Sequence, residues 1–469
     1  MASGRVTPSL VALSLLDRHT NIPMTAVLGP AMKREDIRSS MSPFFVFPAY
    51  KIAYPEVVIS ALQELYVEYN RAFIPLIEAN REWDTDYQYC IQDGTPVNCA
   101  IQIDMAGLPQ GFLDMAAGLP PDVVREMLRR RIFEIENSVA VYQLLERIFS
   151  SNNQDSFFKS RFRATLNNIR KRLKKPIALL AVTRQKYHAM MESELGKQGG
   201  EALSETEVKE RLGFDRFFGP EDFQQYVAEH NGRCDYLLYA RTSDPIEKLK
   251  NPDVKVDHPL LGNPEMRRII KAHSLTLNID APDMDSVRKI NDTKEYQSRM
   301  NMAFAIHAEA DLFSLECAEH LFKGKSYEDF SGINRLSDKF MTYLKHQWLD
   351  PADVESGRTA LRCKPMKCAY GCYGHLVGSL KDSRFRSGLR RNLRQRGGGY
   401  VIQPEMNVPR IVNNTDGTEY AYIDRNFFSF TNGRTRFLGG FRTLMPLNST
   451  EAQNSRIHGN SSTVLAEIT

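Results

Sequence analysis

Three cysteines and one histidine lie within 13 residues in the C-terminal third of the sequence and have the character of metal ligands. Thiolate sulfur and imidazole nitrogen are the ligands that close a tetrahedral zinc site. The gaps of four, three and two residues between them differ from the paired C-x2-C knuckles of common zinc modules. The candidate ligands are Cys363, Cys368, Cys372 and His375.

Two interpretations of this set stay open. Four protein ligands would leave no open position for a catalytic water, so a bound zinc ion would be structural. Alternatively, the cysteines are small buried hydrophobic residues in a glycine-rich fold, or a disulfide plus a spare thiol. The sequence predicts no other cofactor.

A concentrated arginine segment follows the cysteine set. It holds six arginines in 13 residues and no acid, and the planar guanidinium group suits phosphate oxygens and aromatic faces better than lysine does. Two further arginines stand among aromatic residues closer to the C-terminus. The predicted partner-binding residues are Arg384, Arg386, Arg390, Arg391, Arg394, Arg396, Arg434 and Arg436.

The nature of the partner is open at this stage. A basic surface with stackable rings is typical of single-stranded nucleic-acid binding. If Phe427, Phe428, Phe430 and Phe437 form the core of a small β-rich domain instead, the arginines would dock on an acidic protein surface, either a partner subunit or the body of the same chain. The sequence slightly favours protein docking. A basic patch alone does not show whether the acidic partner is a protein or a nucleic acid.

Catalytic motifs are weak. The sequence carries no nucleotide-binding loop, hydrolase elbow or Rossmann fingerprint. In a predicted helix near residues 300–323, the pairs His307/Asp311 and Glu316/His320 would lie on roughly opposite helix faces, so one metal ion could not collect all four. The motifs therefore favour a non-enzymatic protein over an enzyme, and no catalytic residue is assigned.

Hydrophobic periodicity predicts the elements that position these residues. Strands are expected over 177–182, 235–241 and 274–279, and a hairpin over 86–92 and 97–103 around Asp93 and Gly94. A long helix with a seam at coiled-coil spacing is expected from Asp122 to Ser150. Other helices are expected over 55–78, 157–175, 220–230, 286–323 and 331–348.

Composition places the chain among globular proteins: 469 residues, 42% hydrophobic and 25% charged, with no apolar run long enough for a transmembrane segment. The net charge of +4 hides an asymmetry, because residues 357–448 hold 16 Lys/Arg against five acids, a net of +11. We expect an α+β fold: an extended N-terminal arm (1–50), a helix-rich body with short antiparallel hairpins (51–355), a small basic, β/turn-rich C-terminal module (356–448) and a polar tail (449–469).

These features predict a structural or assembly subunit of a larger complex, which contacts acidic surfaces of other protein subunits through its arginine-rich module. The alternative is a nucleic-acid-binding protein with a zinc-stabilised module. Seven cysteines and no secretory signal predict an intracellular, reducing compartment. The N-terminal part of the sequence leaves a mitochondrial location as an alternative. The assembly hypothesis leaves a virion-associated location as another.

Overall fold

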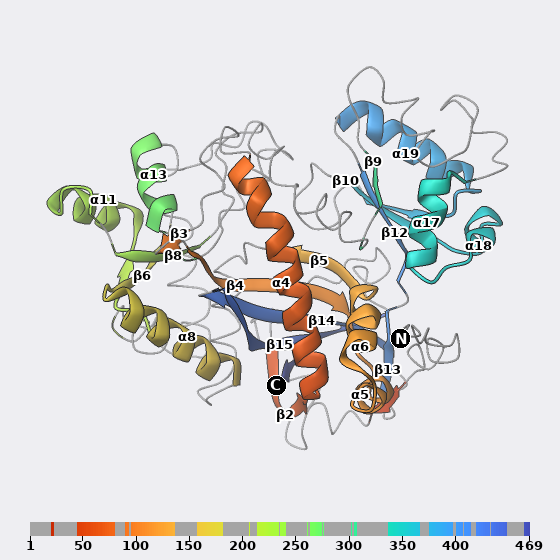
Figure 1. Cartoon of the computed structure of the whole chain (residues 1–469), viewed down its shortest axis with the longest axis horizontal. Coiled ribbons are helices and arrows are strands. Elements are labelled where there is room, and N and C mark those ends of the chain that lie inside the picture. The colour runs from red at the N-terminus through yellow and green to blue at the C-terminus, as the bar shows by residue number, and fades with distance from the viewer. Residues whose placement is uncertain are drawn as a thin grey trace, which may run out of the picture. The chain divides into compact units, whose positions relative to one another are not determined.

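The computed structural model divides the chain into two compact units, each described by itself (Figure 1). Unit 1 comprises Met1–Leu128, Ile135–Asp283 and Val408–Thr469, and unit 2 comprises Arg129–Glu134 and Met284–Asn407. The structure describes residues 20–22, 45–79, 90–92, 95–136, 157–181, 206, 213–233, 235–240, 260, 263–273, 275, 302, 304–306, 336–365, 375–396, 400–406, 408–413, 419–431, 433–447 and 464–469.

A large mixed sheet forms the centre of unit 1. Its longest strands are β4 (Thr95–Ala106), β14 (Glu419–Thr431) and β15 (Arg434–Pro446), which pair antiparallel with β14 in the middle. The described sheet runs in the order β1-β13-β14-β15-β16-β2, and β3, β4 and β5 join it through β4. The remaining strands are β1 (Thr20–Ile22), β2 (Phe45–Ile52), β3 (Cys90–Gln92), β5 (Ile132–Glu136), β13 (Arg410–Asn413) and β16 (Val464–Ile468).

Helices pack on one face of this sheet. The helix α4 (Glu56–Ala79) buries a stripe of residues, and its Tyr66 ring stacks on Phe428 of β14 at 6.0 Å between ring centroids. The shorter helices α5 (Gln110–Ala116) and α6 (Pro121–Arg129) follow β4, and Arg125 of α6 forms a 2.8 Å ion pair with Glu64 of α4. The predicted helix over 55–78 and the predicted hairpin, now β3 and β4, are confirmed.

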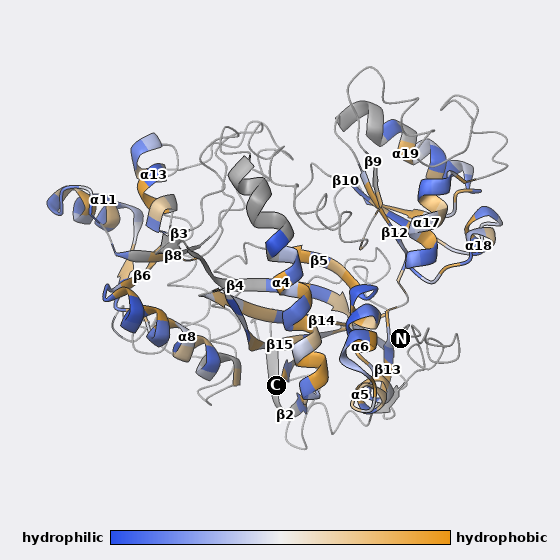
Figure 2. Cartoon of the chain, in the orientation of Figure 1, coloured by the Kyte–Doolittle hydropathy of each residue, from blue (hydrophilic) through white to orange (hydrophobic). Residues whose placement is uncertain are grey.

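Unit 1 also contains a second, small parallel sheet. The strands β6 (Ile177–Ala181), β7 (Arg216–Phe218) and β8 (Tyr236–Ala240) run in the order β7-β6-β8. Helices α8 (Phe157–Leu173), α11 (Pro220–Glu229) and α13 (Pro264–His273) accompany it, and α8 is largely hydrophilic in Figure 2. The predictions of α8, α11, β6 and β8 are confirmed, and Gly232 follows α11 with a φ of 76°.

Unit 2 is built on an antiparallel sheet. Its order is β11-β10-β12-β9, from β9 (Phe304–Ile306), β10 (Leu361–Pro365), β11 (Leu376–Gly378) and β12 (Tyr400–Pro404). The helices are α17 (Asp338–His346), α18 (Pro351–Glu355) and α19 (Ser383–Arg396). Ser337 caps α17 by accepting a hydrogen bond from the Phe340 N–H, which agrees with the helix predicted over 331–348.

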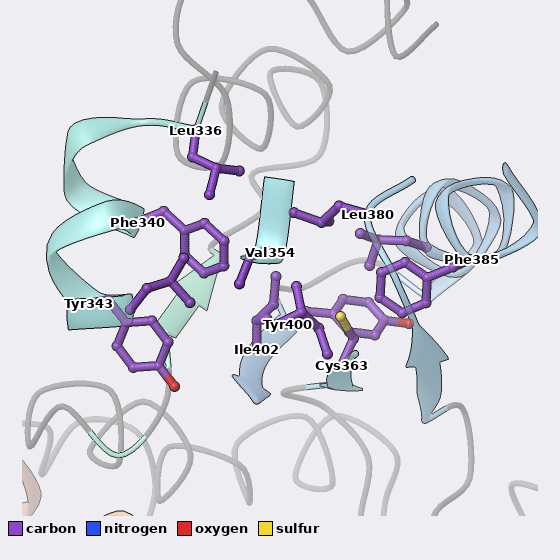
Figure 3. Close-up of a cluster of buried hydrophobic side chains, with 12 residues drawn as sticks. Leu336, Phe340, Tyr343, Val354, Cys363, Leu380, Phe385, Tyr400 and Ile402 are labelled. Atoms are coloured by element: carbon purple, nitrogen blue, oxygen red, sulfur yellow. The ribbon is translucent and has the colours of Figure 1, made fainter. Parts of the chain in front are cut away.

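One hydrophobic cluster holds the helices of unit 2 on its sheet (Figure 3). Phe340 and Tyr343 of α17 enter it from one side, and Phe385 enters it from α19 on the other. Tyr400 and Ile402 of β12 form its floor. Because each side chain is almost fully buried, this cluster fixes the position of α19, which carries most of the predicted partner-binding arginines.

The predicted helix from Asp122 to Ser150 is wrong over residues 130–136. The helix α6 ends at Arg129, and Ile132–Glu136 forms β5, which pairs with β4. The apolar residues Leu128, Ile132 and Ile135 fit a helical stripe, but the Ile-Phe-Glu-Ile-Glu run is rich in β-forming residues and gains the backbone pairing of a sheet. Residues 137–150 lie outside the described residues.

Two other segments differ from expectation. Phe304–Ile306, within the predicted helix over 286–323, forms strand β9 against β12. In the polar tail, Val464–Ile468 forms strand β16 between β15 and β2, and Ile468 is fully buried. The combination of helices with mixed sheets confirms the α+β class.

The predicted C-terminal module is distributed over both units. Residues 356–407 belong to unit 2, and residues 408–448 belong to unit 1. Among the helices that the structure describes, none has the length and apolarity needed to cross a membrane.

Candidate binding surface

The arginine segment forms helix α19 of unit 2. Asp382 precedes it and accepts a 2.8 Å hydrogen bond from the Arg384 N–H, which satisfies one of the free donors at the helix start. The Arg386 guanidinium donates a 2.8 Å hydrogen bond to the Leu380 carbonyl oxygen. Arg386 is therefore half-buried and serves the local structure, in contrast to its neighbours along the helix.

The inner face of α19 is apolar. Phe385 and Leu389 are buried in the unit 2 cluster one helical turn apart. Between them lies Gly388, where an added Cβ would come within 3.2 Å of the Leu376 side chain, so a residue without a side chain allows the helix to approach β11 closely. This inner face leaves the opposite face of the helix for contact with solvent or a partner.

The outward face of α19 carries guanidinium groups. At 100° per residue, Arg390, Arg391 and Arg394 lie roughly opposite the Phe385–Leu389 face. Arg384 and Arg391 are exposed, and within the described part of the chain neither side chain forms an ion pair or hydrogen bond. The side chains of Arg390, Arg394 and Arg396 lie outside the described residues, although their backbone is helical.

The other two predicted partner-binding residues lie elsewhere. Arg434 and Arg436 belong to β15 of unit 1, directly after the turn that contains Gly433 with a φ of 68°. Both side chains are exposed. The structure therefore assigns the predicted arginines to two units: six to α19 and two to the β14–β15 hairpin.

The aromatic residues between these arginines are core residues. Phe427 and Phe428 are fully buried, and Phe430 and Phe437 are nearly so. Phe428 packs on Tyr66 and Phe437, at 6.0 and 5.4 Å between ring centroids. These rings therefore belong to a β-rich core, as one of the two interpretations of the sequence expects. They offer no stacking surface to a base.

The cysteine–histidine set is described in part. Cys363 of β10 is buried in the unit 2 cluster, and its sulfur lies among apolar side chains (Figure 3). Cys363 pairs with Leu376, so their side chains share a sheet face. His375 immediately precedes Leu376, and strand alternation would place its side chain on the opposite face. Cys368 and Cys372 lie outside the described residues, so the zinc site stays a prediction.

The described residues contain no group of three or more His, Cys, Asp or Glu side chains that could hold a metal ion. They do contain a buried charge network that no sequence pattern predicts. Asp424 of β14 and Arg442 of β15 form a bidentate ion pair, with Nε–Oδ1 and Nη2–Oδ2 distances of 2.7 and 2.8 Å. The register places the two residues directly opposite each other.

Two further residues complete this network. The Tyr54 hydroxyl donates to Asp424 at 2.7 Å, and the Leu108 N–H donates to the same carboxylate at 2.8 Å. The Leu108 carbonyl oxygen in turn accepts from Arg442 at 2.6 Å. The network therefore ties together β14, β15, the segment before α4 and the segment after β4.

Electrostatics keep this network charged. Burial would lower the pKa of Arg442, but the adjacent Asp424 carboxylate outweighs it and raises the pKa well above its ordinary value. Burial, reinforced by the Asp424 charge, raises the pKa of the Tyr54 hydroxyl well above 10. Tyr54 is thus a neutral donor over the physiological range, and the network is suited to holding the fold together rather than to proton transfer.

The opposite face of the same sheet is also polar. Arg425, the neighbour of Asp424 along β14, lies 3.8 Å from Asp104 of β4, and Gln102 donates to Asp104 at 2.7 Å. All three side chains are buried. Arginine on β14 and β15 therefore has two roles, pairing with carboxylates inside the sheet and extending into solvent at the hairpin end.

No protein-family model matches this sequence, and no curated protein is similar to it at a significant level.

Proposed function

We propose that this protein is a non-enzymatic structural or assembly subunit of a larger complex, which binds an acidic surface of another protein subunit through the outward face of α19. The arginines of this helix are the functional part of the proposed basic C-terminal module. The proposal keeps the intracellular, reducing compartment inferred from cysteine usage.

The observation that carries the proposal is the two-sided character of α19. Its inner face is fixed on the unit 2 cluster by Phe385 and Leu389, and its outer face presents Arg384 and Arg391 without a partner among the described residues. The helix contains six arginines and no acid, so its charge is not neutralised along its own length. A rigid helix with unpaired guanidinium groups offers forked donors to carboxylates.

The alternative proposal is a nucleic-acid-binding protein with a zinc-stabilised module. The same arginines would supply the positive charge that nucleic-acid binding needs, because guanidinium groups suit phosphates equally well. Its aromatic part has less support, because the rings near the arginines are buried rather than exposed. Protein docking is therefore the better-supported function.

The test is the native mass of the full chain in lysate of its own cells, measured by size-exclusion chromatography with immunodetection. We expect the wild-type chain to elute well above 53.5 kDa, and a variant with Arg384→Gln, Arg391→Gln and Arg394→Gln to elute near that mass. The matched control is Lys339→Gln with Lys345→Gln, which removes exposed positive charge from α17 of the same unit. The control should keep the large complex.

Nuclease treatment separates the two candidates. If the large species survives nuclease and depends on the α19 arginines, an acidic protein partner is supported. If nuclease alone reduces it to the mass of the chain, the nucleic-acid alternative replaces the proposal. If the wild-type chain elutes as a monomer, or the α19 variant keeps the complex, the docking function is wrong.

A further inference from the structure

An exposed serine lies in the middle of the arginine face of α19. At 100° per residue, Ser387 stands about 200° around the helix from Phe385, on the side opposite the buried Phe385–Leu389 face. Ser387 is exposed, and its hydroxyl forms no hydrogen bond with any described residue. The hydroxyl is therefore accessible to a modifying enzyme and is not occupied by the fold.

Two guanidinium groups flank this serine on the helix surface. Arg384 precedes Ser387 by three residues and Arg391 follows it by four, the separations at which side chains are neighbours on a helix, with Cβ atoms about 5–6 Å apart. Both arginines are exposed and form no ion pair or hydrogen bond within the described part of the chain. The helix itself contains no acid. An anion on Ser387 would therefore have both guanidinium groups within reach.

The same spacing suits an arginine-directed protein kinase. Arg384 and Arg386 stand three residues and one residue before Ser387, and the acidic substrate groove of such a kinase recognises guanidinium groups at the N-terminal side of a serine. A kinase binds its substrate in an extended form, so the start of α19 must open transiently. Ser387 is the fifth residue of α19, and helix ends open at a lower free energy than the interior of a fold.

We propose that Ser387 is a phosphorylation site that switches off the docking face of α19, an inference that rests on the proposed docking function. The Ser387 oxygen attacks the γ-phosphorus of ATP, the bond from that phosphorus to the β–γ bridging oxygen breaks, and ADP leaves. The hydroxyl proton passes to a base of the kinase. The phosphoserine carries a charge of about −1.5 to −2 and accepts charge-assisted hydrogen bonds from Arg384 and Arg391. These arginines are then no longer available to the carboxylates of a partner.

The modification is tested on the purified full chain with ATP, Mg²⁺ and a purified arginine-directed serine kinase. We expect a phosphoryl group on Ser387, located by mass spectrometry of peptides from the modified chain. Ser387→Ala should lose that group. The matched control Ser383→Ala removes another exposed serine about one helical turn earlier and should be modified at Ser387 as wild type is. A folded wild-type chain that stays unmodified at Ser387 would overturn the site.

A readout without a partner tests the pairing with arginine. Phosphorus NMR of the modified chain should give a second phosphate pKa below its ordinary value of about 6, because nearby guanidinium groups favour the dianion. Arg391→Gln, which leaves Arg384 in place for kinase recognition, should raise this pKa back towards its ordinary value. The same pKa in both proteins would show that the phosphate does not pair with Arg391 and would contradict the proposed neutralisation.

The effect on docking is measured by adding each form of the chain to lysate with kinase and phosphatase inhibitors, followed by size-exclusion chromatography. Phosphorylation should lower the fraction of wild-type chain in the large complex at least about tenfold, because two guanidinium groups are withdrawn from the partner. Ser387→Ala treated with the kinase should keep the complex.

The outcomes separate the switch from the docking function. A phosphorylated wild-type chain that keeps the large complex would overturn the switch and leave the docking function intact. If the unmodified chain elutes near 53.5 kDa, the docking function is wrong, and the switch fails with it. A chain that forms the complex but is never modified at Ser387 would remove the phosphorylation site alone.

Discussion

The buried part of the β14–β15 hairpin and the outer face of helix α19 both carry arginine, but they use it in opposite ways. On the hairpin, Arg442 is buried and bonded to Asp424, Leu108 and the aromatic face of Tyr422, 4.3 Å away. On α19, Arg384 and Arg391 are exposed and have no partner in the described part of the chain. The comparison shows that arginine density does not define a function, because burial and pairing decide it.

The physical difference is the cost of an unpaired charge. Inside the sheet a guanidinium without its carboxylate would lose its hydration and gain nothing in return, so the pair must be kept intact. On α19 water solvates the exposed guanidinium groups of Arg384 and Arg391, so a partner is optional and their charge remains available for binding. Substitutions in the buried Asp424–Arg442 pair should therefore affect stability, and substitutions on the outer face of α19 should affect association.

The largest effect is expected for Asp424→Ala. This change leaves Arg442 buried without its carboxylate and removes the acceptor for Tyr54 and Leu108, so unit 1 should lose about 4 kcal/mol of stability. Urea denaturation followed by fluorescence measures the loss. The double variant Asp424→Leu with Arg442→Met should be more stable than Asp424→Ala, because it removes both charges of the buried pair and leaves neither without its partner. A single variant as stable as wild type would contradict the network.

A second, somewhat smaller effect is expected on the side of α19. Phe385→Ala removes the ring that fixes the helix on the unit 2 cluster and should cost about 3 kcal/mol in unit 2. Hydrogen exchange should show faster exchange in α19 with unchanged protection of β14 and β15. Equal loss of protection in both units would show that they unfold as one, and the comparison between two separate regions would then fail.

The sequence predicts the elements of both regions better than their roles. The helices α4, α8, α11 and α17 were predictable because an apolar stripe at helical spacing is a property of the local sequence. A similar apolar stripe led to a wrong helix prediction at Ile132–Glu136, where strand pairing with β4 outweighs the local pattern. The tail strand β16 was not predictable, because its burial depends on β15 and β2, which are distant in the sequence.

The candidate site was predictable to a similar degree. The arginines of α19 are evident as a run without acids, but nothing local distinguishes Arg442 from Arg436, since both stand among aromatic and apolar residues of one strand. The pairing of Asp424 with Arg442 follows from the strand register, which the sequence does not state.

A third effect, of about 1 kcal/mol at neutral pH, is expected for Tyr54→Phe, which removes one hydrogen bond to Asp424. The effect should depend on pH. Because burial raises the pKa of Tyr54 well above 10, the unfolded chain loses this proton more readily than the folded one. The stability contributed by the neutral hydroxyl is complete below pH 10 and is lost as the pH rises above it. Denaturation midpoints of both proteins between pH 8 and pH 11 should therefore converge. Parallel curves would show that Tyr54 ionises as an exposed tyrosine does.

The smallest effect on stability is expected for Arg384→Gln with Arg391→Gln. Both side chains are exposed and form no ion pair or hydrogen bond within the described part of the chain. Their replacement therefore removes no described interaction of the folded chain and should move the melting temperature by less than about 2 °C. The matched change Arg442→Gln should lower it far more, since it leaves Asp424 buried and partly unsatisfied. Association should follow the reverse order, with the α19 variant losing the complex and a folded fraction of Arg442→Gln retaining it. If the α19 variant also melts early, its arginines support the fold, and the distinction between a structural and a binding arginine does not hold for this chain.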